Sequence, residues 1–237
     1  MIFPNVGSGM ERDLGSGAIW YAAFLFSTVC HEAAHAWSAA RLGDETAREG
    51  GQVTLNPVPH IRREPLGMVV VPILSWYFGG WIIGWASTPY NLEWSRMYPR
   101  RAALMALAGP ATNLAIAIVA ALLIRVGYEW GVFGIPFQAQ MSHLASSAGG
   151  TVNAFVASLL SIFLSLNLLL CVFNLLPVPP LDGSQAPLLL LPGNAAKGYS
   201  DMLRSPLLRL GGIWVAWTLI PSILPKLVHG VVGLIYL

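Results

Sequence analysis

The sequence predicts an α-helical fold, a polytopic bundle of helices embedded in a membrane. Of its 237 residues, 55% are hydrophobic and only 10% are charged, whereas about a quarter of the residues in a soluble domain are charged. The mean hydropathy is +0.62. The apolar residues gather in runs long enough to cross a bilayer, which takes about 20 residues. We therefore expect one integral membrane domain over residues 1–237, with a core at about 18–190 and C-terminal membrane helices at 207–237.

The apolar runs supply the expected helices in chain order. They are residues 18–40, 66–85, 102–124, 152–176 and 207–224, followed by a weaker apolar tail at 227–237. Residues 42–65 are polar and rich in glycine and β-formers, which favours a loop with short strands near the functional site. The lipid bilayer is thus the expected surrounding of almost the whole chain.

Charge and cysteine content exclude two other classes of protein. The net charge is +2, and no basic tract is interleaved with aromatic residues, so nucleic acid is not an expected partner. Cys30 and Cys171 both lie in apolar runs, where packing is the default role and a disulfide framework is not expected. The sequence predicts no particular oligomeric state.

The first apolar run contains the pentad H-E-A-A-H at residues 31–35. On a helix, His31 and His35 lie one turn apart and can bind one zinc ion, with Glu32 beside them as a base for metal-bound water. Such pentads also occur by chance, and a buried histidine can be satisfied by a carbonyl. In lipid, however, each ionisable group costs about 2–3 kcal/mol. A divalent cation is the simplest common partner, so the pentad favours a metal-dependent hydrolase within the membrane.

A catalytic zinc site needs a third protein ligand and an open position for water. The candidates elsewhere in apolar surroundings are His60, His143, His229 and Asp182. Asp182 follows the run at 152–176, where prolines stop the helix and hold the chain extended. The alternative is that Asp182 only caps a short helix at 185–191.

The pentad and Asp182 can meet only if both helices leave the membrane on one side. The run at 66–85 must then enter and return, with Pro72, Gly79-Gly80 and Gly84 as plausible breaks; such a path is tolerated where it lines a cavity. With this topology, ten of the thirteen Lys and Arg residues share the side onto which the pentad's helix exits. That bias marks the cytoplasm. The ten are Arg41, Arg48, Arg62, Arg63, Arg96, Arg100, Arg101, Lys197, Arg204 and Arg209.

Four motifs together resemble the site-2 protease family of intramembrane zinc metalloproteases, in the compact bacterial branch of peptidase family M50. They are H-E-A-A-H, A-G-P-A-T-N at 108–113, F-N-L-L-P-V-P-P-L-D-G at 173–183 and N-P-V-P-H at 56–60. The resemblance covers residues 27–190. Two stretches depart from the family pattern and bear on substrate choice and loop geometry: I-R-R-E-P-L-G-M after His60, and G-W-A-S-T-P-Y at 84–90, which lacks a lysine.

The resemblance implies a three-helix catalytic core and one zinc ion per chain, held by His31, His35 and Asp182. It implies that Glu32 acts as general base and acid and that Asn174 lies near the substrate carbonyl, although a helix-end hydrogen bond is an equal alternative for Asn174. Asn113 is more typical of helix–helix contacts. His60 is either a residue that shapes the site or a solvated loop histidine.

The expected function is endoproteolysis of transmembrane segments of other proteins, in a bacterial plasma membrane, with the site open to the cytoplasm. An unwound substrate is expected to add to a strand edge at 53–55 or 85–88. One alternative is a non-proteolytic zinc-binding homologue that binds or chaperones membrane helices, which the intact Glu32 disfavours. Another is a metal permease, against which the lack of an internal repeat counts.

Overall fold

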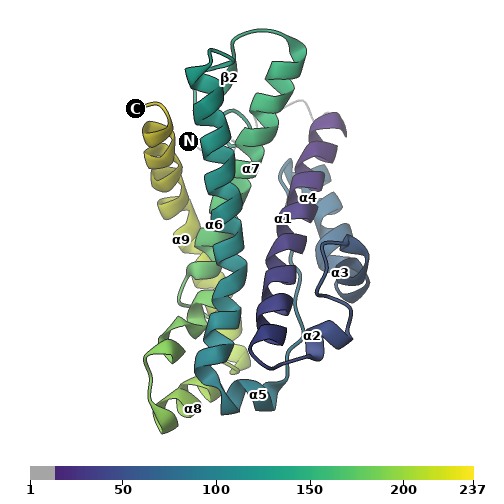
Figure 1. The fold of residues 1–237 in the computed structure, drawn as a ribbon, viewed down its shortest axis with the longest axis vertical. Coiled ribbons are helices and arrows are strands. Elements are labelled where there is room, and N and C mark those ends of the chain that lie inside the picture. Colours follow the sequence, from purple (N-terminus) through teal and green to yellow (C-terminus); the bar gives the residue numbers. More distant parts are fainter. Residues whose placement is uncertain (1–13) are drawn as a thin grey trace.

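The structure, a computed structural model, describes residues 14–237, and within them four long helices stand side by side (Figure 1). They are α1 (Leu14–Arg41), α6 (Pro99–Glu129), α7 (Thr151–Leu175) and α9 (Pro206–Ile235). Helix α6 packs against the other three. Helices α1 and α7 end at the same end of the bundle, at which α6 and α9 begin (Figure 1). The predicted helical bundle is confirmed.

Shorter elements connect the long helices. They are α2 (Thr46–Glu49), α3 (Pro57–Arg63), the π-helix η1 (Leu66–Val70), α4 (Val71–Gly79), α5 (Leu92–Met97), β1 (Phe133–Gly134), β2 (Ser146–Ser147), the 3-10 helix η2 (Asp182–Leu189) and α8 (Gly193–Met202). The two strands form one antiparallel pair, with Phe133 opposite Ser147.

The expected position of the strands is wrong. No strand forms between residues 42 and 65, all of which the structure describes, because this stretch holds α2 and α3. Asn56 Oδ1 accepts a hydrogen bond from the Val58 N–H, and Pro57 occupies the first turn of α3, which together start a helix. The strands lie in the α6–α7 connection, at the far end from α2, α5 and α8 (Figure 1). Residues 53–55 and 85–88 form no strand edge either.

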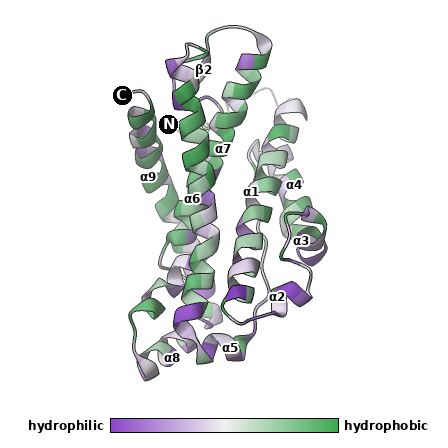
Figure 2. Ribbon diagram, in the orientation of Figure 1, coloured by the Kyte–Doolittle hydropathy of each residue, from purple (hydrophilic) through white to green (hydrophobic). Residues whose placement is uncertain are grey.

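Within the described residues, α6, α7 and α9 are long and apolar enough to cross a membrane. Figure 2 shows hydrophobic residues along α9 and the upper parts of α6 and α7, and hydrophilic residues gathered around α2 and α5. Large side chains on the outer face of α9, such as Leu210 and Trp214, are about 70% exposed and suit a lipid surrounding. The chain is an integral membrane protein.

The C-terminal region forms one helix where two membrane segments were expected. Helix α9 continues through Pro221 and Pro225 for 30 residues. Prolines are tolerated within membrane helices because neighbouring groups satisfy the freed carbonyls. The weaker apolar tail is therefore the last part of α9.

Residues 66–85 double back on themselves, as the predicted entry and return requires. Helices η1 and α4 lead away, and Gly80, with φ +73°, ends α4 in the left-handed conformation that glycine adopts without steric cost. The chain then returns in an extended form until the Trp85 N–H donates to the Gly67 carbonyl at 3.1 Å. The two ends of the segment thus meet, and the turn lies at Gly79-Gly80.

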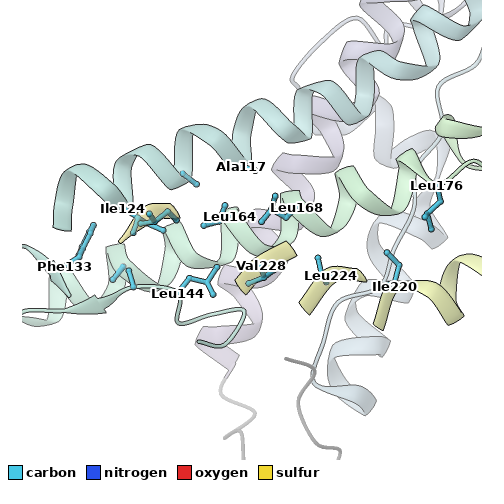
Figure 3. Packing of buried hydrophobic residues seen from close by; sticks show 14 of the residues in the cluster. Ala117, Ile124, Phe133, Leu144, Leu164, Leu168, Leu176, Ile220, Leu224 and Val228 are labelled. Atoms are coloured by element: carbon cyan, nitrogen blue, oxygen red, sulfur yellow. The ribbon is translucent and has the colours of Figure 1, made fainter. Parts of the chain in front are cut away.

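The main hydrophobic core lies among α6, α7, α9 and the α6–α7 connection (Figure 3). Ile124, Leu164, Leu224 and Val228 are almost completely buried in it. Because this core fixes α6 against α7, it also fixes the relative positions of the groups that these helices present to α1.

Candidate metal centre

Three potential ligand atoms converge between α1 and the start of η2. His31 Nε2 and His35 Nε2 lie 2.9 Å apart, and Asp182 Oδ2 lies 3.2 Å from the first and 3.4 Å from the second. Ligands about 2.0–2.1 Å from a tetrahedral zinc ion are about 3.3–3.4 Å from one another. The triangle of donor atoms therefore has nearly the size that a zinc ion requires.

The far nitrogen of each imidazole faces a carbonyl-type oxygen. His31 Nδ1 lies 2.6 Å from Asn113 Oδ1, and His35 Nδ1 lies 2.8 Å from the Met105 carbonyl. These oxygens can only accept, so each Nδ1 carries a proton, and in the neutral form that binds a metal each ring would present its Nε2 lone pair to the space between them. Hydrogen bonds of this kind orient metal-binding histidines.

Asp182 Oδ2 completes a cluster of acceptors. It is buried and accepts no hydrogen bond from any residue within 14–237. With both rings neutral, two lone pairs and a carboxylate oxygen would meet here without a proton between them, which is costly in a buried site. A single proton satisfies one pair of these atoms, whereas a divalent cation satisfies all three. The donor set of two imidazoles and one carboxylate fits zinc.

Gly109 on α6 provides the space beside the cluster. A Cβ added there would overlap both His31 Nε2 and His35 Nε2. The glycine of the A-G-P-A-T-N motif thus lets α6 approach α1 closely and leaves room where a cation would sit.

The turn between α7 and η2 brings Asp182 back toward α1. Gly183 lies so close to the Leu175 carbonyl that a Cβ would overlap it, so the chain can double back here only with glycine. The N-cap position of η2 is Leu181, and Asp182 is the first residue of the helix itself. Asp182 therefore does not occupy the capping position, and its carboxylate faces the two histidines instead.

Glu32 is 5% exposed and borders the cluster. One of its carboxylate oxygens and the ligand nitrogens of His31 and His35 lie within 4.8 Å of one another. Thr88 Oγ1 lies 2.7 Å from Glu32 Oε2 and 3.0 Å from the Glu32 carbonyl, so its hydroxyl can donate to the carboxylate. Thr88 belongs to the stretch 84–90, which the sequence marked as a departure from the family pattern and, at 85–88, as a strand edge for substrate, but not as a partner of Glu32.

The other predicted residues lie elsewhere. His60 is buried and its Nε2 donates to the Thr54 carbonyl at 3.0 Å, so it is not a solvated histidine. His143 forms a bridge with Gln140 in the α6–α7 connection, and His229 is exposed on α9. Of the four candidates for a third ligand, the structure brings only Asp182 to the two histidines.

Asn174 lies in the last turn of α7, and its Nδ2 donates to the Leu170 carbonyl at 3.1 Å. In this structure it thus makes the helix-end hydrogen bond. Asn167 lies seven residues earlier on the same helix and was not predicted from the sequence. It donates and accepts within the buried network that reaches His31.

Comparisons with known proteins agree with this geometry. The sequence profile of peptidase family M50 matches residues 19–211. The chain is 34% identical over 160 residues to "Putative zinc metalloprotease YwhC" of Bacillus subtilis, covering 67% of this chain and 63% of that protein.

Two proteins named "Putative zinc metalloprotease Rip2" are each 32% identical to the chain. The one from Mycolicibacterium smegmatis matches over 162 residues, 68% of this chain and 53% of its own length. The one from Mycobacterium tuberculosis matches over 165 residues, 70% and 54% respectively. The chain thus spans between about half and two thirds of the length of these relatives. No solved structure matches the chain significantly.

Proposed function

Because the chain belongs to peptidase family M50, we propose that it is a zinc metalloprotease that hydrolyses peptide bonds within or near transmembrane segments of other membrane proteins. The observation that carries the proposal is the convergence of His31 Nε2, His35 Nε2 and Asp182 Oδ2 inside a membrane helix bundle. We assign these three residues as the zinc ligands. The relatives are named as zinc metalloproteases, which supports the zinc-dependent protease part of this proposal.

When bound, a zinc ion would lower the pKa of a water molecule toward neutrality and polarise the scissile carbonyl. Glu32, beside the ligands, takes the proton of the attacking water and passes it to the leaving amine. Thr88 holds the Glu32 carboxylate on one side, so that its orientation is set before substrate arrives. Asn174 can turn its amide from Leu170 toward the developing oxyanion, which a preorganised donor stabilises by up to a few kcal/mol.

We assign the cytoplasm to the end of the bundle that holds α2, α5 and α8, in a bacterial plasma membrane. Arg41 ends α1 at this end, and Arg100 and Arg101 begin α6 there. Arg101 Nη1 also donates to the Leu42 carbonyl at 3.0 Å, joining the two helix ends. This clustering of basic residues supports the orientation by the positive-inside rule.

The substrate is a single helix that must unwind before cleavage, because a transmembrane helix hides its peptide bonds in internal hydrogen bonds. Segments that contain Gly, Pro, Asn or Ser unwind more readily. We therefore expect cleavage to favour such segments over uniform leucine helices.

The test is cleavage of a panel of single-span substrates by the purified chain in proteoliposomes. Native protein should carry one zinc per chain and cleave. Glu32→Gln should retain zinc and lose cleavage, and a chelator should abolish cleavage reversibly. Equal cleavage by Glu32→Gln contradicts the proposed base. Native protein that holds zinc but cleaves no substrate would favour the non-proteolytic alternative.

A further inference from the structure

A chain of buried hydrogen bonds runs from α7 through α6 to the metal centre in α1. Asn167 Nδ2 donates to Ser27 Oγ and to the Phe163 carbonyl, each at 2.9 Å. Asn113 Nδ2 donates to Asn167 Oδ1 at 2.8 Å, and Asn113 Oδ1 faces His31 Nδ1 at 2.6 Å. Ser27, Asn113 and Asn167 are 0% exposed, so bulk water does not reach these three side chains.

The donor-to-acceptor direction of these hydrogen bonds is fixed at the Phe163 end. The Phe163 carbonyl can only accept, so the NH2 group of Asn167 must face it, and Asn167 Oδ1 must face Asn113. Asn113 then has to present its own NH2 group to Asn167 and its oxygen to His31. The proton of the His31 ring is thereby held on Nδ1, and Nε2 keeps its lone pair for the centre.

This hydrogen-bond network excludes the opposite orientation of the Asn113 amide. If the Asn113 amide turned over, its NH2 group would face His31 Nδ1, and the ring proton would move to Nε2. That proton would point at His35 Nε2, only 2.9 Å away, and could form a hydrogen bond there. This tautomer occupies both imidazole lone pairs and competes directly with a cation.

We propose that Asn167 is a positioning residue that selects the metal-binding tautomer of His31 by orienting the amide of Asn113. The proposal rests on the proposed function, since it takes His31 as a zinc ligand. Buried amides in membrane proteins often serve only to join helices, a role that either orientation of the amide fulfils. Here Phe163 imposes one orientation, and that orientation has a consequence at the metal centre.

Zinc affinity of the purified full chain tests the proposal, measured by competition with a chromogenic chelator. Asn167→Leu has nearly the same volume but no polar atom, so Asn113 loses its orienting partner. We expect its zinc affinity to fall about 10–100-fold, the range found when partners of metal-ligating histidines are removed. Asn167→Asp still presents an acceptor to Asn113, whether ionised or protonated, and should stay within about threefold of native.

Ser165→Ala is the matched control. Ser165 is also a fully buried polar residue of α7, but its hydroxyl lies 2.6 Å from the Met141 carbonyl and does not reach the centre. Its zinc affinity should remain native even if its thermal stability falls. The proposal is overturned if Asn167→Leu keeps native zinc affinity. It is also overturned if Ser165→Ala and Asn167→Asp lose as much zinc affinity as Asn167→Leu.

A second measurement reads the His31 tautomer in the native chain and uses a variant only to assign the signal. Nitrogen NMR of the zinc-free native chain, labelled with ¹⁵N-histidine, distinguishes the two imidazole tautomers, and loss of one signal in His31→Gln assigns His31. We expect the proton on His31 Nδ1; a proton on Nε2 overturns the proposal. If the native chain binds no zinc at all, the proposed function fails. If the native chain binds zinc and Asn167→Leu binds it equally well, only the role of Asn167 fails.

Discussion

Gly109→Ala should abolish zinc binding with a single methyl group. The added Cβ would lie 2.5 Å from His31 Nε2, whereas atoms of this size ordinarily approach to about 3.5 Å. Helices α1 and α6 must therefore separate by about 1 Å, or the rings must turn away. Metal sites tolerate deviations of only about 0.2 Å in ligand distance, so the donor triangle cannot survive either movement.

We expect the zinc affinity of Gly109→Ala to fall by at least about 100-fold and its unfolding free energy to fall by about 1–3 kcal/mol, the usual cost of overpacking. Metal content after dialysis at limiting zinc and thermal unfolding in detergent measure the two effects. Gly198→Ala is the control, because a Cβ at this position in α8 meets no atom within 4 Å. Native zinc affinity in Gly109→Ala would refute the placement of the cation against α6.

Three further changes probe other parts of the molecule. Thr88→Val removes the hydroxyl beside Glu32 while keeping the shape of the side chain, so single-turnover cleavage should slow about tenfold at unchanged zinc content. Thr88→Ser should restore the rate. An unaffected rate in Thr88→Val would show that Glu32 needs no such partner. Asp182→Ala should lose bound zinc in metal analysis, and retained stoichiometric zinc would remove Asp182 from the ligand set. Gly80→Ala places a side chain at φ +73° and should lower the unfolding free energy by about 1–2 kcal/mol; unchanged stability would mean that the turn relaxes.

The sequence predicted those parts of the site that depend on local geometry. His31 and His35 share a face because an α-helix repeats every 3.6 residues, and no tertiary knowledge is needed for that. The reversal at Gly79-Gly80 followed from glycine and from the need for both helix exits on one side. The choice of Asp182 over a capping role could be made only once the turn at Gly183 was seen.

Thr88 and Asn167 were missed because their partners lie on distant segments. Thr88 meets Glu32 across 56 residues, and Asn167 meets Asn113 across 54; no periodicity records such pairs. The strands expected at 42–65 do not form, because the Asn56-Pro57 helix start overrides the β-forming composition of this stretch. Helix α9 was divided because prolines lower apparent continuity, although packing of Leu224 and Val228 in the core supports the helix through them.

The order of the three proposed zinc ligands along the chain has a consequence for biosynthesis. Asp182 is synthesised 147 residues after His35, which at roughly 5–20 residues per second takes about 7–30 s. During that interval α1 already exists with its two imidazoles and one carboxylate but without the third ligand. Stable metal loading therefore follows the insertion of α6 and α7, and a nascent protein halted before η2 would hold zinc only weakly. The proposed activity would thus begin late in assembly, after the helices that enclose the centre are in place.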